Sequence, residues 1–430
     1  MVLAVYRIIV GLLFWLSFPI LLGVVLITGR HRRGVNERLG LYTPTARTPG
    51  TTGRLWIHAA SIGEVRAAGV FIDHLRPGLE SWDFVVTTMT IHGRDFARRH
   101  LGRDIACYLA PLDVPFVAGR VARRIAPDCY VCLETELWPI LISVFKRQGA
   151  GAALINGRLS DKSFASYCRY KFFFGNVLKK FNLIAAITGE DRKRFIEVGA
   201  EPRAVTVTGN IKHDFTPPAD RDGTRYKWRQ TLGITAAADV IIAGSTHAPE
   251  EELLLPVYSE MTAGADQLWL IAPRHLDRLD SIQALLDRTG LSYDLLSSLK
   301  QGKIRTGTLI LVDTFGDLTE LFSIATLVFV GGTLAPCGGH NVMEVASWDK
   351  VVLFGPHIND FKASAAILEK SGAGFNVATI DEMKTTMESL LQDRDHLAVL
   401  QQRAGEAAAA QQGAGKRQAE LVLGLIRGAA

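Results

Sequence analysis

The sequence predicts an α/β protein with two parallel sheets, each covered by helices on both faces, and an apolar helix ahead of them. Three observations predict it. Apolar runs of strand length alternate with helix-length stretches, one segment rich in proline and charge interrupts this alternation, and the chain opens with an uncharged apolar run. At 430 residues, 48% of them hydrophobic, the chain is long enough for two domains of ordinary size.

The first element is the apolar run over residues 8–28, which is long enough to cross a bilayer as a helix. The flanking basic residues are Arg7 before it and Arg30, Arg32, Arg33 and Arg38 after it. By the positive-inside rule, the rest of the chain is cytoplasmic. A cleaved signal peptide is the alternative, but the run is long for one and lacks a clean cleavage site. Because Pro19 could break the helix, a helix lying flat in the membrane surface also stays open. We expect a single-pass anchor over residues 1–30.

The alternating elements form two blocks. The strands expected in the first block cover residues 54–60, 82–90, 128–134, 152–157, 183–188 and 204–209. Those of the second block cover residues 239–246, 267–274, 308–314, 326–333 and 351–356. Residues 215–223 hold two prolines, a glycine and several charges, which is typical of a linker. We therefore expect one domain over residues 31–215 and a second over 216–430 that includes an Ala/Gln-rich C-terminal helix. Two such halves make the cleft between them the expected ligand site.

Candidate ligand residues follow the strands, because ligands of open α/β sheets bind beyond the carboxyl ends of strands. In the second block, the glycine-rich stretch from Gly331 leads to a helix that begins near Asn341, and such a helix start favours an anion. Glu344 could accept hydrogen bonds from the hydroxyls of a nucleotide ribose. Asn341 and Glu344 also have the spacing of a capping box, which needs no ligand.

Two further strand ends in the second block carry candidates. Pro273 ends a strand, and Arg274 after it could pair with a phosphate as a fork, although a surface arginine is the plain alternative. Gly316 lies in a strand-to-helix turn, where Phe315 and Asp317 could hold a base or a ribose. For Asp317, capping of the next helix is an equally ordinary role.

In the first block, Glu64 follows a strand at a helix start and could be a general base, since a helix N-terminus favours the ionised carboxylate. Ser61 and Glu64 have capping-box spacing as well, which by spacing alone is the favoured interpretation. Glu134 directly follows another strand, with Glu136 and Trp138 beyond it. Lys212 follows a third strand near the linker, where a cation could neutralise developing charge or could simply be solvated.

Composition excludes several classes of protein. The net charge of +5 is too small for the dense basic surface of a nucleic-acid-binding protein, but it suits an anionic ligand or membrane. Five cysteines suggest no disulfide framework. Cys129 and Cys132 form a C-x-x-C, but they lie in an expected buried strand without a second pair, so no metal site is expected.

Taken together, these stretches resemble the 3-deoxy-D-manno-octulosonic acid (Kdo) transferases of lipopolysaccharide synthesis. The segments that carry the resemblance, in chain order, are SIGEV, VTTMT, PLDVP, ETELWP, NGRLSDKS, VTGNIKHD, STHAPEE, PRHLDR, DTFGDL, FVGGTL, GGHNVMEVA and GPHINDF. They cover nearly the whole chain. The resemblance implies the GT-B fold: two Rossmann-like domains facing an interdomain cleft, with an N-terminal membrane anchor helix.

The resemblance also implies roles for residues. Glu64 matches the catalytic base, and Glu134 and Lys212 match positions that stabilise the transition state. The residues that match CMP-binding positions are Pro273 and Arg274, then Phe315, Gly316 and Asp317, then Asn341, Val342, Met343 and Glu344. Phe315, Asp317, Val342 and Met343 depart from the usual residues of the family.

By the same resemblance, the enzyme is an inverting glycosyltransferase that moves Kdo from CMP-Kdo to a lipid A precursor without a metal or other cofactor. It is expected at the bacterial inner membrane, held by membrane lipid, with its catalytic domains in the cytoplasm and no nucleic-acid partner. Two alternatives stay open: another GT-B enzyme that uses or epimerises a UDP-sugar, and a membrane-anchored adaptor. Competition by CMP or UDP separates the enzymes, and loss of function in Glu64→Ala and Glu344→Ala excludes the adaptor.

Overall fold

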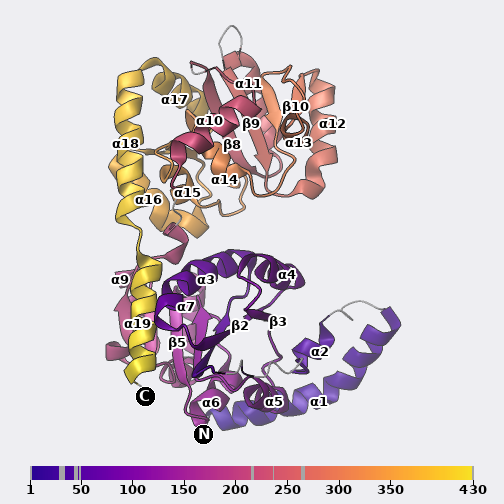
Figure 1. Cartoon of the computed structure of the whole chain (residues 1–430), viewed down its shortest axis with the longest axis vertical. Helices are drawn as coiled ribbons and strands as arrows, with labels where there is room; N and C mark the ends of the chain where they lie inside the picture. Colours follow the sequence, from indigo (N-terminus) through magenta and orange to yellow (C-terminus); the bar gives the residue numbers. More distant parts are fainter. Residues whose placement is uncertain are drawn as a thin grey trace. The chain divides into compact units, whose positions relative to one another are not determined.

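A computed structural model describes residues 2–28, 34–42, 47, 50–214, 217–235, 237–262 and 267–428 (Figure 1). The chain divides into two compact units, one of residues 1–214 and 412–430 and the other of residues 215–411. The break after residue 214 lies where the linker was expected, although residues 215 and 216 are outside the described part. The single C-terminal helix expected in the second domain is two helices: the Ala/Gln-rich helix α18 (Arg394–Ala410) belongs to the second unit as expected, whereas the last helix, α19 (Ala414–Gly428), belongs to the first unit, which corrects the expected placement.

The first unit is built on a seven-stranded parallel sheet of order β3-β2-β1-β4-β5-β6-β7. Its strands are β1 (Gly53–His58), β2 (Trp82–Thr88), β3 (Ala106–Leu109), β4 (Cys129–Leu133), β5 (Gly151–Gly157), β6 (Leu183–Ala186) and β7 (Val205–Val207). Its helices are α1 (Val2–Thr28), α2 (Val35–Arg38), α3 (Ile62–Leu75), α4 (Ile91–His100), α5 (Pro115–Ile125), α6 (Pro139–Arg147), α7 (Asp161–Arg169), α8 (Lys171–Leu178), α9 (Gly189–Val198) and α19 (Ala414–Gly428), with 3-10 turns η1 (Arg76–Gly78), η2 (Pro202–Ala204) and η3 (Ile211–His213).

Alternating side chains of the central strands fill two apolar layers, one on each face of this sheet. On β1, Trp56 points into the layer formed with α5, α6, α8 and α9, whereas Leu55 and Ile57 point into the layer formed with α3, α4 and α19. Every residue of β1 is buried. This is why the centre of the strand, residues 55–57, is continuously apolar rather than alternating.

The C-terminal helix α19 packs on the first sheet through Ala419 and Val422. The side chain of Gln418, which is fully buried, links α19 to the rest of the unit through hydrogen bonds. Its amide nitrogen donates to Thr208 Oγ1 at 2.9 Å, and its carbonyl oxygen accepts from the Asn156 backbone N–H at 3.0 Å. The sequence predicted one continuous helix through both α18 and α19, so it did not reveal that α19 packs on the first unit, where the buried Gln418 has specific partners.

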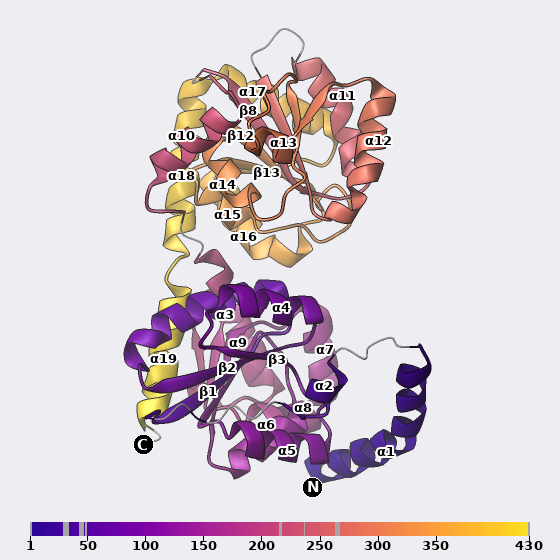
Figure 2. The ribbon, with the colours of Figure 1, turned by 45° about the vertical axis from the view of Figure 1, so that its right-hand side comes forward.

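The N-terminal helix α1 lies against the first unit along one side (Figure 2). Phe14 is buried, the Tyr6 and Phe173 rings are 4.9 Å apart, and Trp15 stacks on Phe116 at 5.3 Å. The helix continues through Pro19, so the break that this proline could have caused is not present. The other side of α1 is exposed and apolar; its exposed members include Ile8, Ile9, Leu12, Leu13, Leu16 and Ile20.

Of the basic residues expected to flank this helix, only Arg38 after the run is described. Its guanidinium donates to the carbonyl oxygens of Ala110, at 2.9 Å, and Met89, so it belongs to the first unit's own structure. Arg30, Arg32 and Arg33 lie outside the described residues. Within α1, Val2–Ile20 has the length and mean hydropathy, 1.9, of a membrane-crossing helix.

The second unit repeats the architecture with a sheet of order β10-β11-β9-β8-β12-β13-β14. Its strands are β8 (Asp239–Thr246), β9 (Gln267–Pro273), β10 (Tyr293–Leu295), β11 (Leu309–Leu311), β12 (Leu327–Val330), β13 (Val351–Phe354) and β14 (Gly374–Asn376). Its helices are α10 (Arg221–Thr231), α11 (Glu250–Thr262), α12 (Leu279–Thr289), α13 (Leu296–Lys300), α14 (Leu318–Leu321), α15 (Val342–Ala346), α16 (Lys362–Ser371), α17 (Ile380–Gln392) and α18 (Arg394–Ala410), with 3-10 turns η4 (Leu276–Arg278), η5 (Phe322–Ile324) and η6 (Asn359–Phe361).

Its core is again divided by the sheet. Leu268 and Leu270 of β9 face the layer that holds Trp228 of α10, while Trp269 between them faces the layer formed with α11, α12 and α17. All the strands expected from the sequence are present in the two sheets. The structure adds β3, β10 and β14, which the sequence did not predict; each lies at the edge of its sheet.

Candidate functional site

The first unit places its candidate residues at the carboxyl end of its sheet, where the strand order reverses. β1 pairs with β2 on one side and with β4 on the other, so the loops after β1 and β4 leave the sheet in opposite directions. Such a reversal leaves a crevice between the two loops. Glu64 follows β1, and Glu134 follows β4. The site predicted from the sequence in this unit therefore lies where α/β folds bind ligands.

Glu64 lies in the first turn of α3 and is 7% exposed. Its carboxylate accepts hydrogen bonds from the Ala60 backbone N–H at 2.8 Å and from the Ser61 hydroxyl at 2.9 Å. Ser61 in turn caps the helix by accepting from the Glu64 backbone N–H. The capping interpretation is thus correct for Ser61. The Glu64 carboxylate accepts from the Ala60 backbone N–H and not from that of Ser61, so the reciprocal half of a capping box is not formed.

Burial raises the pKa of Glu64, and the negative charges of Glu134 and Glu136 raise it further. The hydrogen bonds from Ala60 and Ser61 oppose this effect because they favour the ionised form. A carboxylate destabilised by burial and by like charges is a stronger base than a solvated one.

Glu134 and Lys212 form an ion pair in this unit. The distance between Lys212 Nζ and Glu134 Oε1 is 2.5 Å, and each side chain is 33% exposed. Glu134 has a left-handed backbone with φ 55°, a strained conformation for a residue other than glycine. Its N–H still donates to the Ile155 carbonyl at 2.9 Å, so the turn after β4 is fixed from both ends. Lys212 is thus a positioned cation and not a solvated lysine.

Sequence reasoning missed His58, the last residue of β1. Its ring is buried, with Nδ1 3.0 Å from Thr87 Oγ1 and with no hydrogen-bond partner for Nε2 among the described residues. Burial, aided by the positive charge of Arg38, lowers its pKa to about 3, so the imidazole is neutral. The Trp138 ring lies edge-on at 5.5 Å. The available signal was a histidine that directly follows the apolar run Leu55 to Ile57 at the end of a strand.

In the second unit, the glycine-rich loop also lies at a reversal of strand order, between β8 and β12. Glycine is required here by close packing. A Cβ on Gly331 would lie 2.6 Å from the Ser245 carbonyl oxygen, and one on Gly339, which has φ 81°, would lie 2.4 Å from Ile358 Cδ1. The abundance of glycine that the sequence shows thus serves backbone packing at these two positions.

Glu250 holds this loop and was also missed. It is fully buried in the first turn of α11. Oε2 accepts from the N–H groups of His247, at 2.9 Å, and Gly332, at 2.7 Å. Oε1 accepts from three successive N–H groups, those of Thr333, Leu334 and Ala335, at 2.9–3.1 Å. The consecutive acids of the STHAPEE segment were its only sequence signal.

The expected helix start at Asn341 is present but short, because α15 has five residues. The Asn341 side chain accepts from the Met343 N–H at 3.1 Å and donates to Glu344 Oε1 at 3.3 Å. Val342 and Met343 are buried in the apolar core. The structure therefore leaves those two no side-chain contact with a ligand, and it places only Asn341 and Glu344 at the partly exposed surface.

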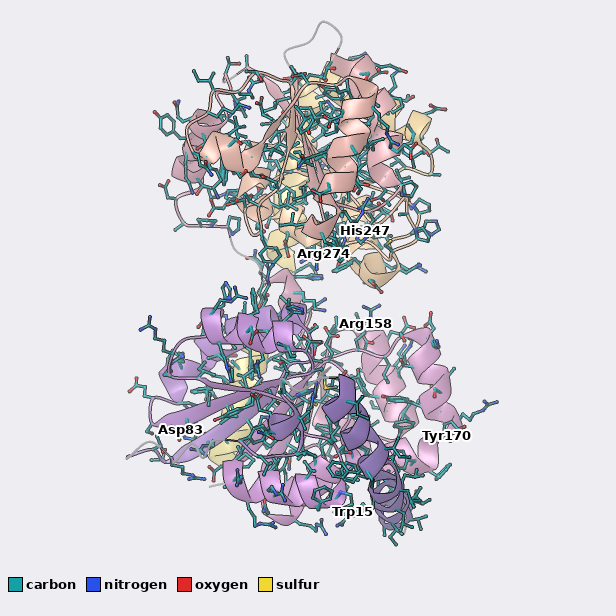
Figure 3. The ribbon with its side chains drawn as sticks, turned by 90° about the vertical axis from the view of Figure 1, so that its right-hand side faces the viewer. Trp15, Asp83, Arg158, Tyr170, His247 and Arg274 are labelled. Carbon is teal, nitrogen blue, oxygen red and sulfur yellow. The ribbon has the colours of Figure 1, made fainter. Side chains whose placement is uncertain are left out.

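Two histidines lie beside this loop. The Nε2 atoms of His247 and His340 are 3.1 Å apart and their rings are stacked. Burial lowers the pKa of His340 to about 3, and the positive charge of Arg274 contributes. Arg274 follows β9, with its N–H bonded to the Thr246 carbonyl at 3.0 Å, while Pro273 before it is buried. Figure 3 shows Arg274 and His247 at the same end of the second unit. The Arg274 side chain is exposed and has no ion pair within the described part of the chain.

The remaining candidates surround the turn after β11. Phe315 is 66% exposed, and Gly316 has φ 96°, which explains the glycine. Asp317 makes no side-chain cap to α14; instead, its carboxylate accepts from Lys300 Nζ at 2.8 Å and from the Thr314 hydroxyl at 2.5 Å. The capping alternative for Asp317 is therefore wrong. The exposed Phe315 ring is free to stack on a ligand.

Neither cysteine pairing nor a metal cluster is found in the described part of the chain. Cys129 and Cys132 are buried free thiols, and burial raises the pKa of both, that of Cys129 to about 12. Both are therefore protonated and unreactive near neutral pH. The described residues contain no group of three or more His, Cys, Asp or Glu arranged to hold a metal ion. That transfer needs no metal stays a prediction.

Comparison with known proteins gives a consistent result. Residues 33–215 match the sequence profile of a family described as "3-Deoxy-D-manno-octulosonic-acid transferase (kdotransferase)". A 3-deoxy-D-manno-octulosonic acid transferase of Chlamydophila psittaci is 32% identical over 84% of this chain and 82% of its own length. One of Haemophilus influenzae is 30% identical over 85% of both.

Solved structures show the same fold. Anabaena Alr3699/HepE in complex with UDP and glucose has a TM-score of 0.57 and 14% identity over 86% of this chain and 99% of its own. A UDP-GlcNAc 2-epimerase from Neisseria meningitidis has a TM-score of 0.58 and 12% identity over 87% and 100%. The predicted GT-B class, with two Rossmann-like units, is confirmed.

Proposed function

The chain belongs to the 3-deoxy-D-manno-octulosonic-acid (Kdo) transferase family, and on this premise we propose that it moves Kdo from CMP-Kdo to a lipid A precursor with Glu64 as the general base. Membership makes the chain a glycosyltransferase of lipopolysaccharide biosynthesis. The observation that carries the rest is a buried carboxylate of raised pKa, at the strand-order reversal of the first sheet, beside a carboxylate–lysine pair.

The proposed chemistry is a single displacement. Glu64 takes the proton of an acceptor hydroxyl as that oxygen forms a bond to the anomeric carbon of Kdo. The bond from this carbon to the phosphate oxygen of CMP breaks on the opposite side, so the configuration inverts and CMP leaves. A proton acceptor positioned in this way contributes about 10²–10⁴-fold to the rate.

Lys212 supplies positive charge near the base. The sugar has a carboxylate and the leaving group a phosphate, so negative charge increases on the departing side during the reaction. Glu134 orients Lys212 through the 2.5 Å ion pair and also raises the pKa of Glu64. His58, neutral and buried, supports the wall of this site without adding charge.

The second unit is proposed to bind the donor. Arg274 is an exposed guanidinium suited to the phosphate of CMP, and Phe315 is an exposed ring suited to the base. Glu344 is proposed to accept from the ribose hydroxyls, and its hydrogen bond from the Asn341 side chain supports this by orienting the carboxylate. Gly316 keeps the turn open, since no atom lies within 4 Å of the position that a Cβ would take.

The proposal is tested by transfer in detergent with purified full-length protein. We expect radiolabelled Kdo, formed into CMP-Kdo, to appear on a lipid A precursor, and CMP to compete with the donor while UDP does not. Inhibition by UDP instead of CMP would exclude this donor. A folded protein without transfer to this acceptor would exclude the acceptor.

The raised pKa of Glu64 predicts a shifted pH profile. The base must be ionised, so kcat/KM rises with pH through the folded-state pKa, which lies above the value of about 4.3 for a solvated glutamate. Glu134→Gln removes a negative neighbour and frees the Lys212 ammonium; both changes lower the pKa of Glu64. We expect the acid limb of the profile to move to lower pH in this variant.

The matched control for this profile is Glu80→Gln, because Glu80 is an exposed carboxylate outside the site. It should leave the acid limb in place, even if overall rates differ between preparations. An acid limb that stays unchanged in Glu134→Gln would show that another group controls it, and Glu64 would lose its assignment as the base.

We further propose that α1 holds the enzyme to the bacterial inner membrane, where the lipid acceptor is concentrated, with the catalytic units in the cytoplasm. Its packing through Phe14 and Trp15 supports a helix that lies along the membrane surface with its apolar side in the lipid. This arrangement differs from the single-pass anchor expected from the sequence.

The double variant Leu12→Lys/Leu16→Lys tests this anchor. Both side chains are exposed on α1, 60% and 74%, so charge there leaves the packing of the unit unchanged but opposes burial in lipid. We expect the membrane-bound fraction in sedimentation to fall at least about tenfold. Leu253→Lys, at an exposed leucine of α11, should leave that fraction as in wild type. Full retention of the double variant would contradict the proposed anchor.

A further inference from the structure

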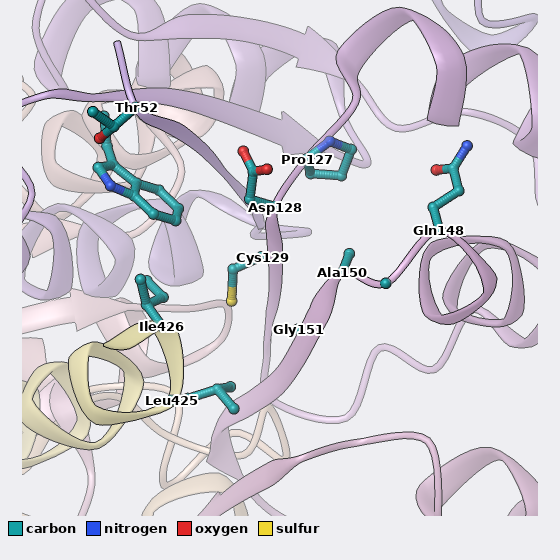
Figure 4. Close-up of a pocket in the computed structure, with 11 residues that line it drawn as sticks. Thr52, Pro127, Asp128, Cys129, Gln148, Ala150, Gly151, Leu425 and Ile426 are labelled. Carbon is teal, nitrogen blue, oxygen red and sulfur yellow. The ribbon is translucent and has the colours of Figure 1, made fainter. Parts of the chain in front are cut away.

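Each unit has a hollow at the amino ends of its strands, the edge opposite the loops described above. In the first unit this hollow measures about 290 Å³ and lies between the starts of β1, β4 and β5 and the end of α19 (Figure 4). Its lining has one charged residue, Asp128, which is paired with Arg47 at 2.8 Å. Because this one charge is already paired, the lining of this hollow gives no chemical indication of a ligand.

The hollow of the second unit is larger and strongly cationic. It measures about 540 Å³ and lies between α10, α18 and the starts of β8, β12 and β13. Figures 1 and 2 both show α10 and α18 on the same side of this unit. Its charged lining residues are Arg225, Arg229, Asp239, Lys350 and Arg394.

Of the four cationic lining residues, only Arg394 forms an ion pair with a carboxylate of the described lining. Arg394 forms a two-pronged ion pair with Asp239, with nitrogen-to-oxygen distances of 2.7 and 2.5 Å. Arg225 donates through Nε to the Ser323 carbonyl at 3.2 Å, and the carboxylate contact that the described residues give it, with Asp222, is 3.4 Å long. Arg229 donates to the Thr235 carbonyl. Carbonyl oxygens satisfy hydrogen bonds but do not neutralise charge.

The burial of Lys350 makes the excess of positive charge in this hollow energetically unfavourable. Its side chain is 8% exposed, and no hydrogen bond or ion pair engages its ammonium within the described part of the chain. The neighbouring Asp349 carboxylate is bonded to Arg221 at 2.7 Å. Burial, together with the charges of Arg225, Arg221 and Arg229, lowers the pKa of Lys350 to about 7. An unpaired buried ammonium is among the least favourable groups in a protein.

A second unsatisfied group lies at the same place. Ser323 is fully buried and lines the hollow, and its hydroxyl has no hydrogen-bond partner among the described residues. Among the described residues, the hollow therefore combines two cations without a carboxylate partner, Arg229 and Lys350, with Arg225, whose ion pair with Asp222 is long at 3.4 Å, and one hydroxyl without a hydrogen-bond partner. An oxyanion with several acceptor atoms and more than one negative charge would satisfy all of them.

We propose that this hollow is an anion-binding site that accepts a phosphate or pyrophosphate group, with Lys350 and Arg229 as its principal ligands. The site lies at the strand edge opposite Arg274 and Glu344, so it is separate from the proposed donor site. Its volume exceeds that of a single phosphate, so a phosphorylated small molecule or a phospholipid headgroup fits equally well. Binding returns the Lys350 ammonium to its charged form and stabilises the second unit.

Calorimetric titration of the full-length protein in detergent at low ionic strength tests the proposal. The probes are inorganic pyrophosphate and monomeric dihexanoyl phosphatidic acid, each titrated with and without excess CMP to occupy the proposed donor site. We expect saturable binding that persists in excess CMP. Lys350→Met and Arg229→Met should each weaken it about tenfold or more, because each removes a charged hydrogen-bond donor.

Arg288→Met is the matched control, since Arg288, like Arg229, lies in the last turn of its helix but is exposed and outside the hollow. It should bind as wild type does. Lys350→Met removes a buried charge and keeps the chain length, so it should fold, which its unfolding temperature without ligand checks. Binding of pyrophosphate alone assigns a soluble ligand; binding of the lipid probe alone assigns a headgroup. Absence of binding by both probes, or full binding by Lys350→Met, would overturn the proposal.

Discussion

Replacing Glu64 by glutamine should lower Kdo transfer by about 10²–10⁴-fold while leaving CMP affinity unchanged. The amide has nearly the same shape as the carboxylate. Its oxygen can still accept from the Ala60 N–H, and the Ser61 hydroxyl can turn to accept from the amide nitrogen. The fold is therefore retained, and the variant loses only the ability to accept a proton. Steady-state transfer rates together with CMP titration measure the two effects separately.

The control must distinguish two causes of lost activity in Glu64→Gln: loss of the general base and disturbance of the N-cap of α3. Thr90 caps α4 in the same unit, accepting from the Gly93 N–H at 3.0 Å, and no described acidic residue bonds to its hydroxyl. Thr90→Ala should cost about 1 kcal/mol of unfolding free energy and leave turnover within a few-fold of wild type. If Glu64→Gln merely lost the same stability and kept its turnover, Glu64 would be a structural residue alone.

The sequence predicted the interior of both sheets but not their edges. Strands such as β1 and β8 are buried on both faces, so selection for apolar residues leaves a run that is easily recognised. The missed strands, β3, β10 and β14, have three or four residues each and lie at sheet edges. A segment so short has too few positions to show a pattern, and pairing with a neighbouring strand is what fixes it.

The residues of the candidate site also divide into those that the sequence pattern reveals and those that it does not. Polar residues that follow a strand directly, such as Glu64, Glu134 and Arg274, are visible in a sequence because the fold places all such positions at one edge. Val342 and Met343 were included because the run from Asn341 to Glu344 matches a CMP-binding run of the resembled family, and the helical turn rotates their side chains into the core. His58 and Glu250 were missed because their importance comes from partners that are distant along the chain.

The largest loss of donor binding is expected from Glu250→Gln. The wild-type carboxylate accepts five backbone N–H groups, two on Oε2 and three on Oε1, and four of these belong to the loop from Gly332 to Ala335. An amide offers one oxygen, and its NH₂ group must then face N–H groups that also donate. Donors left unsatisfied inside the protein cost about 1–3 kcal/mol each, so we expect the second unit to lose about 3 kcal/mol or more.

The same loop leads to Asn341 and Glu344, so its displacement should also weaken CMP binding by an order of magnitude or more, roughly the effect of one lost charged hydrogen bond. Denaturant unfolding and CMP titration measure the two losses. Glu252→Gln makes the same chemical change two residues further along α11, at an exposed position, and should alter neither quantity. Should Glu250→Gln match Glu252→Gln in both measurements, the loop would have to be fixed by its glycines and its contacts with Ile358 and Asp360, and the buried carboxylate would be dispensable.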